Sequence, residues 1–154
     1  MIWMKNILPA TTQRVATYTN PDINEMIRSN TLENLICLKD ADQEELTRQI
    51  RKLNSEWDAE RFVEAKAAVC IMGCSLFGIS KSKYWSFLTL ITATFLLQHA
   101  LLGWCPSAPV MRKMGIRTAE EINQEKIVLK TLRKDFAHVK PNDVGDLLKA
   151  AEKQ

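Results

Sequence analysis

The residues of this chain that could carry chemistry are its four cysteines and one of its two histidines, His99. Cys105 stands directly before Pro106 at the end of a long apolar run, where a thiol can meet both lipid and water. Nearby cations lower the pKa of a thiol, and the thiolate is its reactive form. Cys105 is therefore a candidate reactive thiol. The other interpretation is that Trp104, Cys105 and Pro106 form only an interfacial anchor and a helix stop.

Three charged or titratable residues are candidates to tune that thiol: Arg61, Glu64 and His99. If two apolar helices pair so that Ile79 lies opposite Tyr84, the same register places His99 opposite Glu64. It also brings Cys105 close to the level of Arg61. An imidazole beside a carboxylate in an apolar setting either fixes helix register or forms a working site.

The remaining cysteines have simpler explanations. Cys37 lies in an apolar stretch and is expected to be a small core residue. Cys70 and Cys74 lie four residues apart on one helix face, where small size explains them. No third and fourth ligand accompanies them, so we expect no metal and no cofactor. Nucleophile triads, CxxC pairs and glycine-rich phosphate loops do not stand out, and the sequence does not indicate an enzyme.

Two apolar runs, residues 67–79 and 84–104, position these side chains and are joined by a short polar turn. Trp85 and Trp104 are separated by about 28 Å of helix, close to the thickness of the hydrocarbon core of a bilayer. With Trp57, they are the predicted anchors at the membrane interface. The short turn allows only an antiparallel pair. A soluble bundle that buries both helices is the alternative.

Basic residues predict the orientation of this pair. Two lie in the turn, Lys81 and Lys83. Seven lie close outside the pair: Arg51, Lys52, Arg61, Lys66, Arg112, Lys113 and Arg117. Since basic residues accumulate on the cytoplasmic side, both termini are expected in the cytoplasm.

Small residues form a ridge on the first apolar helix: Cys70, Gly73, Cys74 and Gly78. In lipid, small side chains let helix backbones approach closely, so this ridge is the predicted packing interface. It would contact either the second helix or another copy of the protein. We therefore expect the lipid bilayer as one partner, and a homodimer or a larger membrane complex as the assembly.

The two ends of the chain have helical patterns. Asp42 with Glu45, and Thr118 with Glu121, resemble capping boxes that open amphipathic helices. No strand pattern is present. The predicted fold is all-α, a two-helix transmembrane hairpin with amphipathic cytoplasmic helices on both sides. Its predicted segments are residues 1–55, 56–105 and 106–154. A net charge of +3 over 154 residues, with no basic run interleaved with aromatic residues, argues against a nucleic-acid partner.

Three segments in this order resemble the YgaP-type transmembrane domain, a small bacterial inner-membrane family of uncharacterised function: residues 56–61, 96–106 and 114–125. The resemblance implies an inner-membrane hairpin, sometimes associated with sulfane-sulfur chemistry. The namesake of the family is described as dimeric and has a rhodanese domain before the hairpin. Here a helical segment takes the place of that domain, so sulfurtransferase activity is not carried over. Ser107 stands where the family commonly has a second proline.

The leading hypothesis is a non-enzymatic inner-membrane protein that acts as a structural, accessory or oligomerising subunit. The alternative is a module that handles sulfur as a persulfide or thiol adduct on Cys105, tuned by Arg61, Glu64 and His99. A channel of oligomerised hairpins has less support, because the apolar runs contain few polar residues.

Overall fold

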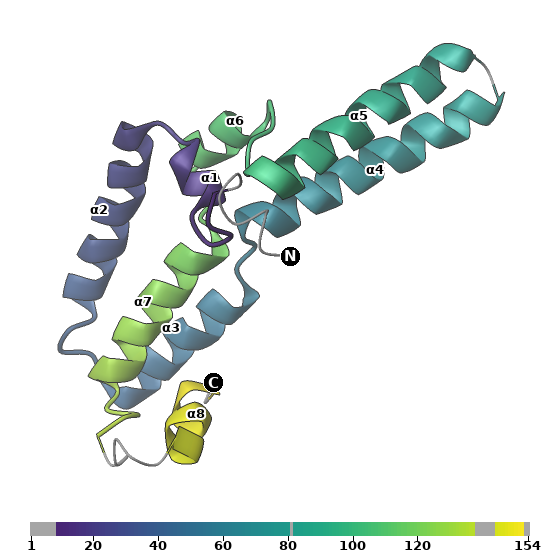
Figure 1. Ribbon diagram of the computed structural model, residues 1–154. Helices are drawn as coiled ribbons and strands as arrows, with labels where there is room; N and C mark the ends of the chain where they lie inside the picture. The colour runs from purple at the N-terminus through teal and green to yellow at the C-terminus, as the bar shows by residue number, and fades with distance from the viewer. Residues whose placement is uncertain (1–8, 81, 138–143, 153–154) are drawn as a thin grey trace. The chain divides into compact units, whose positions relative to one another are not determined.

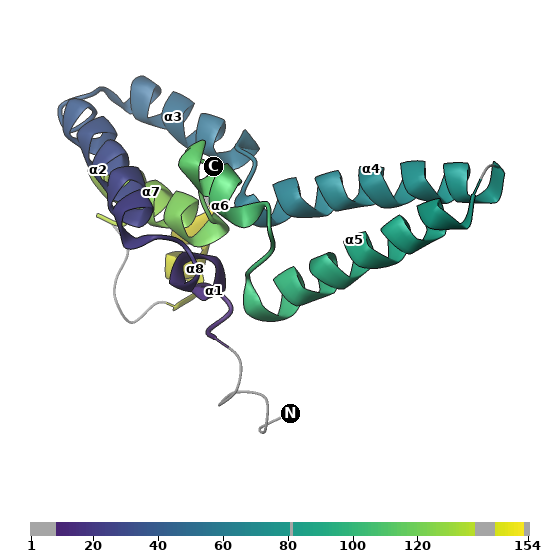
Figure 2. The ribbon, with the colours of Figure 1, turned by 90° about the horizontal axis from the view of Figure 1, so that it is seen from above.

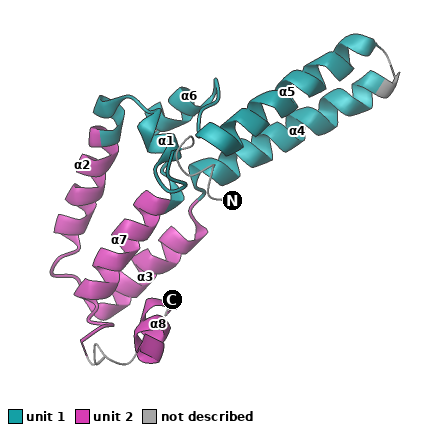
Figure 3. Ribbon diagram, in the orientation of Figure 1, with its two compact units in different colours: residues 1–24, 57–119 teal, residues 25–56, 120–154 magenta. Residues whose placement is uncertain are grey.

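The computed structural model describes residues 9–80, 82–137 and 144–152 (Figure 1). These residues form eight helices and no strand, which confirms the all-α prediction. Their contacts divide the chain into two compact units (Figure 3). Unit 1 comprises residues 1–24 and 57–119, and unit 2 comprises residues 25–56 and 120–154. Each unit therefore combines two separate stretches of the chain.

Unit 1 is built on two long antiparallel helices, α4 (Ala59–Ser80) and α5 (Lys83–Leu102), which lie side by side in both views (Figures 1 and 2). Ser82 caps α5, because its side chain accepts a hydrogen bond from the backbone N–H of Tyr84. Gly103 ends α5 in the left-handed conformation, at φ +78°. That conformation is nearly free of strain only for glycine.

Three pairs of residues show the register of these helices: Cys70 with Thr92, Phe77 with Trp85, and Gly78 with Ser86. The Sγ of Cys70 lies 3.5 Å from the Oγ1 of Thr92, and the centroids of the two aromatic rings are 5.1 Å apart. A Cβ added to Gly78 would lie only 2.9 Å from the Oγ of Ser86. The close approach of the two backbones at this point therefore depends on a glycine.

Among the described helices, α5 is the one that is long and apolar enough to cross a membrane. Only 6% of its most apolar stretch is buried inside the protein. Its threonines return their hydroxyls to carbonyls one turn back, as Thr89 does to Trp85 and Thr94 to Leu90. Polar groups satisfied within the helix suit a lipid environment. Helix α4 carries charged residues in its first two turns, and its crossing of the membrane stays a prediction.

The N-terminal segment packs against the end of α5. Helix α1 (Arg14–Thr17) places Arg14 so that its guanidinium donates a 2.8 Å hydrogen bond to the carbonyl of Ala100 and lies 3.8 Å from the carboxylate of Glu60. A Cβ on Gly103 would lie 2.5 Å from the carbonyl carbon of Arg14. The left-handed turn after α5 is therefore in direct contact with the backbone of α1.

A buried arginine holds the segment that follows α5. Helix α6 (Ala108–Lys113) contains Arg112, which is completely buried. Its guanidinium donates hydrogen bonds to the carbonyl of Ile116, at 3.1 Å, and to the Oδ1 of Asn24, at 2.9 Å. Asn24, in the first turn of α2 (Pro21–Cys37), donates in turn to the carbonyl of Ala16. This network joins α6 to the N-terminal segment within unit 1.

Unit 2 has its own core, in which α3 (Gln43–Ser55) packs against α7 (Ala119–Leu132). The facing residues are Leu46, Ile50, Leu53, Ile122 and Leu129. The predicted cap is confirmed, because the side chain of Asp42 accepts a 2.8 Å hydrogen bond from the backbone N–H of Glu45. Helix α3 ends at Ser55, before Trp57. The remaining helix is α8 (Val144–Glu152), where the carbonyl of Ala151 accepts a hydrogen bond from Lys130.

Substitution of Gly103 tests the contact between α1 and α5. Gly103→Ala introduces both a side chain at positive φ and a clash with the backbone of Arg14, whereas Gly115→Ala, at φ +82° in open space, introduces only the first. We expect Gly115→Ala to lower the free energy of unfolding by about 1–2 kcal/mol, and Gly103→Ala to lower it clearly more. Thermal unfolding of the protein in lipid nanodiscs measures both. Equal losses in the two variants would contradict the contact.

Candidate thiol site at the base of the hairpin

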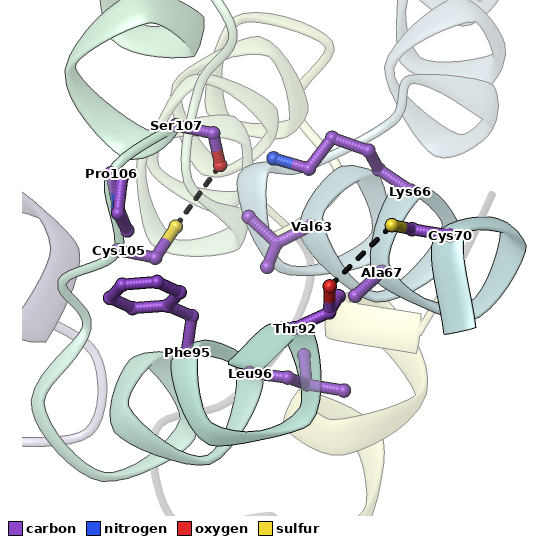
Figure 4. A pocket seen from close by; sticks show the side chains of 10 residues that line it. All are labelled: Val63, Lys66, Ala67, Cys70, Thr92, Phe95, Leu96, Cys105, Pro106 and Ser107. Atoms are coloured by element: carbon purple, nitrogen blue, oxygen red, sulfur yellow. Dashed lines mark hydrogen bonds between the residues drawn. The ribbon is translucent and has the colours of Figure 1, made fainter. Parts of the chain in front are cut away.

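A cavity of about 290 Å³ opens between α4, α5 and the segment after α5 (Figure 4). Most of its wall is apolar, and its polar atoms come from a lysine, two hydroxyls and two thiols. The lining residues are Val63, Lys66, Ala67, Cys70, Thr92, Phe95, Leu96, Cys105, Pro106 and Ser107. All of them belong to unit 1.

Cys105 lies in this wall and is almost fully buried, with 4% of its surface exposed. It packs in a cluster with Val63, Ala108 and Met111. Its Sγ lies 3.2 Å from the Oγ of Ser107, and its carbonyl accepts a hydrogen bond from the backbone N–H of Ala108. Solvent therefore reaches the thiol chiefly through the cavity.

His99 sits in the last turn of α5 and is 98% buried, with 2% of its surface exposed. Its carbonyl accepts a 2.7 Å hydrogen bond from the backbone N–H of Gly103, which fixes the end of the helix. Its ring lies close enough to Cys105 to interact with the thiol. Within the described part of the chain, neither ring nitrogen makes a well-aligned hydrogen bond. In ligand-free proteins, the hydrogen bonds of catalytic groups are often long or poorly aligned and tighten only when a ligand binds.

The surroundings of Cys105 have opposing effects on its acidity. Burial, the largest single effect, raises the pKa of the thiol. The nearby ring of His99 and the hydrogen bond with Ser107 together outweigh burial and lower the pKa of the thiol to about 7. An ordinary cysteine has a pKa of about 8.5. About half of the Cys105 side chains are then thiolate at neutral pH.

The other two residues proposed to tune this thiol, Arg61 and Glu64, do not line the cavity that Cys105 faces. Arg61 is exposed, and its guanidinium lies 4.7 Å from the centroid of the Trp57 ring. Glu64 is also exposed, and neither residue lines the cavity. Lys66 and Ser107, and not Arg61 and Glu64, line the cavity together with Cys105. The sequence contained a signal for Lys66 in its i,i+4 spacing from Cys70, whereas the contact of Ser107 depends on the turn after α5.

The small-residue ridge lies mostly against α5. Cys74 is buried, the Sγ of Cys70 lies 4.0 Å from that of Cys74, and Gly78 meets Ser86. Gly73 differs, because a Cβ there would meet no other atom within 4 Å. Cys70 and Gly78 therefore contact the second helix, Cys74 is buried beside Cys70, and Gly73 leaves space beside α4.

The three tryptophans predicted as membrane anchors lie at the ends of the hairpin helices. Trp57 precedes α4, Trp85 lies in the first turn of α5, and Trp104 follows α5. Trp57 and Trp85 are exposed and Trp104 is half-buried. Anchoring by these rings stays a prediction. Within residues 9–80, 82–137 and 144–152, no group of three or more histidine, cysteine, aspartate or glutamate side chains could hold a metal ion.

The described residues form a helical hairpin with a buried thiol at its base, and one of its two helices, α5, is long and apolar enough to cross a membrane. Residues 58–121 match the model of the family described as inner membrane protein YgaP-like, transmembrane domain. The resemblance deduced from the sequence is thereby confirmed for these residues, and the segment is assigned to an inner-membrane domain family. No curated protein and no solved structure matches the chain.

The acidity of Cys105 is directly testable. Thiolate increases as pH rises through the pKa, so the rate of alkylation of Cys105 should reach half its maximum at pH about 7. His99→Ala removes the lowering interactions of the ring, and the midpoint should then move upward. At pH 7 we expect the thiolate fraction to fall from about half to a few per cent. Residue-resolved mass spectrometry follows the reaction. Cys37 serves as internal reference, because it is exposed and the prediction of a core position for it is wrong. A midpoint near 8.5 in the unaltered protein, or one unmoved by His99→Ala, would argue against the site.

Proposed function

We propose that this protein is a small integral inner-membrane protein that handles sulfur as a persulfide or thiol adduct on Cys105. The observation that carries the proposal is the position of this thiol, against the buried ring of His99 and facing a cavity. A buried cysteine that served only packing would have its pKa raised, whereas the pKa of Cys105 is lowered to about 7.

The chemistry needs only a thiolate and a sulfur donor. The thiolate of Cys105 attacks the sulfane sulfur of a donor such as thiosulfate. A new sulfur–sulfur bond forms on Cys105, the original bond of the donor breaks, and sulfite leaves with the electron pair. The interactions with His99 and Ser107 that lower the pKa of the thiol also suit the resulting persulfide anion. The residues assigned to this step are Cys105 as nucleophile, with His99 and Ser107 as the neighbours that lower its pKa.

The proposed topology determines on which side of the membrane the site lies. Basic residues flank the hairpin at the end where Cys105 lies, among them Arg61 and Lys113. With both termini in the cytoplasm, the cavity opens at the cytoplasmic surface of the inner membrane. Soluble sulfur donors of the cytoplasm would then have access to it.

A structural, accessory or oligomerising role is the second candidate, and two observations favour it. Leu32 and Ile36 lie one turn apart on α2 and are 52% and 62% exposed, which suits a protein partner. Gly73 leaves open space beside α4, where the backbone of a second copy could approach closely in lipid. A homodimer or a larger membrane complex would use these surfaces.

The sulfur-handling proposal predicts that Cys105 gains one sulfur atom. After incubation with thiosulfate at pH 7, mass spectrometry should find the added sulfur on Cys105 and not on the exposed Cys37. His99→Ala should slow the transfer about tenfold, in proportion to the lost thiolate. Cys105→Ser should abolish it while membrane insertion is retained. Addition at all four cysteines alike, or none at Cys105, would refute the proposal.

The oligomerising role predicts a different pattern of substitutions. Gly73→Leu projects into open space and should weaken association of two copies without disturbing the hairpin. Gly78→Leu meets Ser86 and should destabilise the hairpin itself. Chemical crosslinking in native membranes reports association, and thermal unfolding reports the hairpin. Undiminished association of the Gly73→Leu protein would show that this face of α4 does not mediate association.

A further inference from the structure

We propose that the cavity beside Cys105 binds a free, single-chain anionic amphiphile, with its acidic head group at Lys66 and its apolar chain between α4 and α5. The inference deepens the proposed function and rests on it, because it names the class of ligand that would occupy the cavity in front of the thiol. It depends on the composition of the wall, the position of one cation and the volume of the cavity.

The wall has two chemically distinct parts. Val63, Ala67, Phe95 and Leu96 present carbon atoms from both long helices and form the apolar part. Lys66, Cys105 and Ser107 supply the polar groups, and Figure 4 shows their nitrogen, sulfur and oxygen directed toward the same space. Ligand pockets commonly combine an apolar body with a few polar groups that orient the ligand. A molecule with one apolar chain and one polar end fits this division.

The charge of the polar part selects an anion. A lysine side chain supplies three donors and a positive charge. Among the described residues, none forms an ion pair with Lys66. Glu64, two residues away, lies outside the cavity wall. A cation without a partner at the edge of an apolar space favours a carboxylate or another acidic head group.

The volume favours one chain over a whole phospholipid. About 290 Å³ is at the lower end of the range for small-molecule pockets. Two acyl chains and a head group require far more space than this. The cavity lies at the end of α5, the helix suited to the membrane, so a single-chain amphiphile could enter it from the bilayer. Decanoate is a suitable probe.

The first test uses protection of Cys105 from alkylation. In zwitterionic nanodiscs at constant pH, saturating decanoate should slow the alkylation of Cys105 about tenfold, while decanol slows it far less. Lys66→Met should weaken the protection by decanoate about tenfold, since a charge-assisted contact is lost. Lys66→Arg should retain it. Lys113→Met, which changes an exposed lysine of α6 outside the cavity wall, is the matched control and should leave protection unchanged.

A second measurement separates this inference from the proposed function. Binding of radiolabelled decanoate to Cys105→Ser nanodiscs needs no reactive thiol, so binding there with loss in Lys66→Met supports the ligand site even if sulfur transfer fails. Conversely, a reactive Cys105 with no decanoate binding overturns only the ligand site. Equal protection by decanoate and decanol would overturn the role of Lys66. Protection by anionic bilayers without decanoate would overturn the free amphiphile as occupant.

Discussion

The exposed apolar surface of α5 is the constraint on which the rest of the structure depends. Helix α5 is long and apolar, and its most apolar stretch is only 6% buried by the rest of the protein. Phe87, Leu90 and Leu97 each expose more than 60% of their surface. The hydroxyls of Thr89 and Thr94 bond to the backbone of their own helix, so these groups need no hydrogen-bond partner outside α5. A bilayer satisfies both conditions at once.

The residues at the base of the hairpin form the site around Cys105. Gly103 turns the chain at the end of α5, and the left-handed turn allows α1 to touch it. Arg14 and the buried Arg112 then connect the N-terminal segment to α5 and α6. Cys105 follows this turn and lies near His99, which is in the last turn of α5. Arg14 and Asn24, which make these contacts, lie outside the family match at residues 58–121.

Much of the hairpin could be predicted from the sequence, because helical periodicity and a short turn leave little choice of register. The expected pairing is within one residue of the observed contacts of Cys70 with Thr92 and Phe77 with Trp85. The surroundings of Cys105 could be predicted only in part. His99 lies on the same helix end and was a candidate. Arg61 was expected near the thiol, yet it lies over the ring of Trp57, since exposed side chains are free to choose among partners. Arg14 lies far from α5 in the sequence, so no local sequence pattern predicts the contact between them.

The most direct test of the account is the reactivity of a cysteine placed on the lipid-facing side of α5. Leu90 is 62% exposed in the isolated chain. Leu90→Cys, in a protein whose native cysteines are replaced by serine, is treated with a water-soluble maleimide in intact membranes. The account predicts almost no labelling until the membrane is dissolved and the protein denatured. Rapid labelling in intact membranes would show that water, and not lipid, surrounds the hairpin, and would contradict the account.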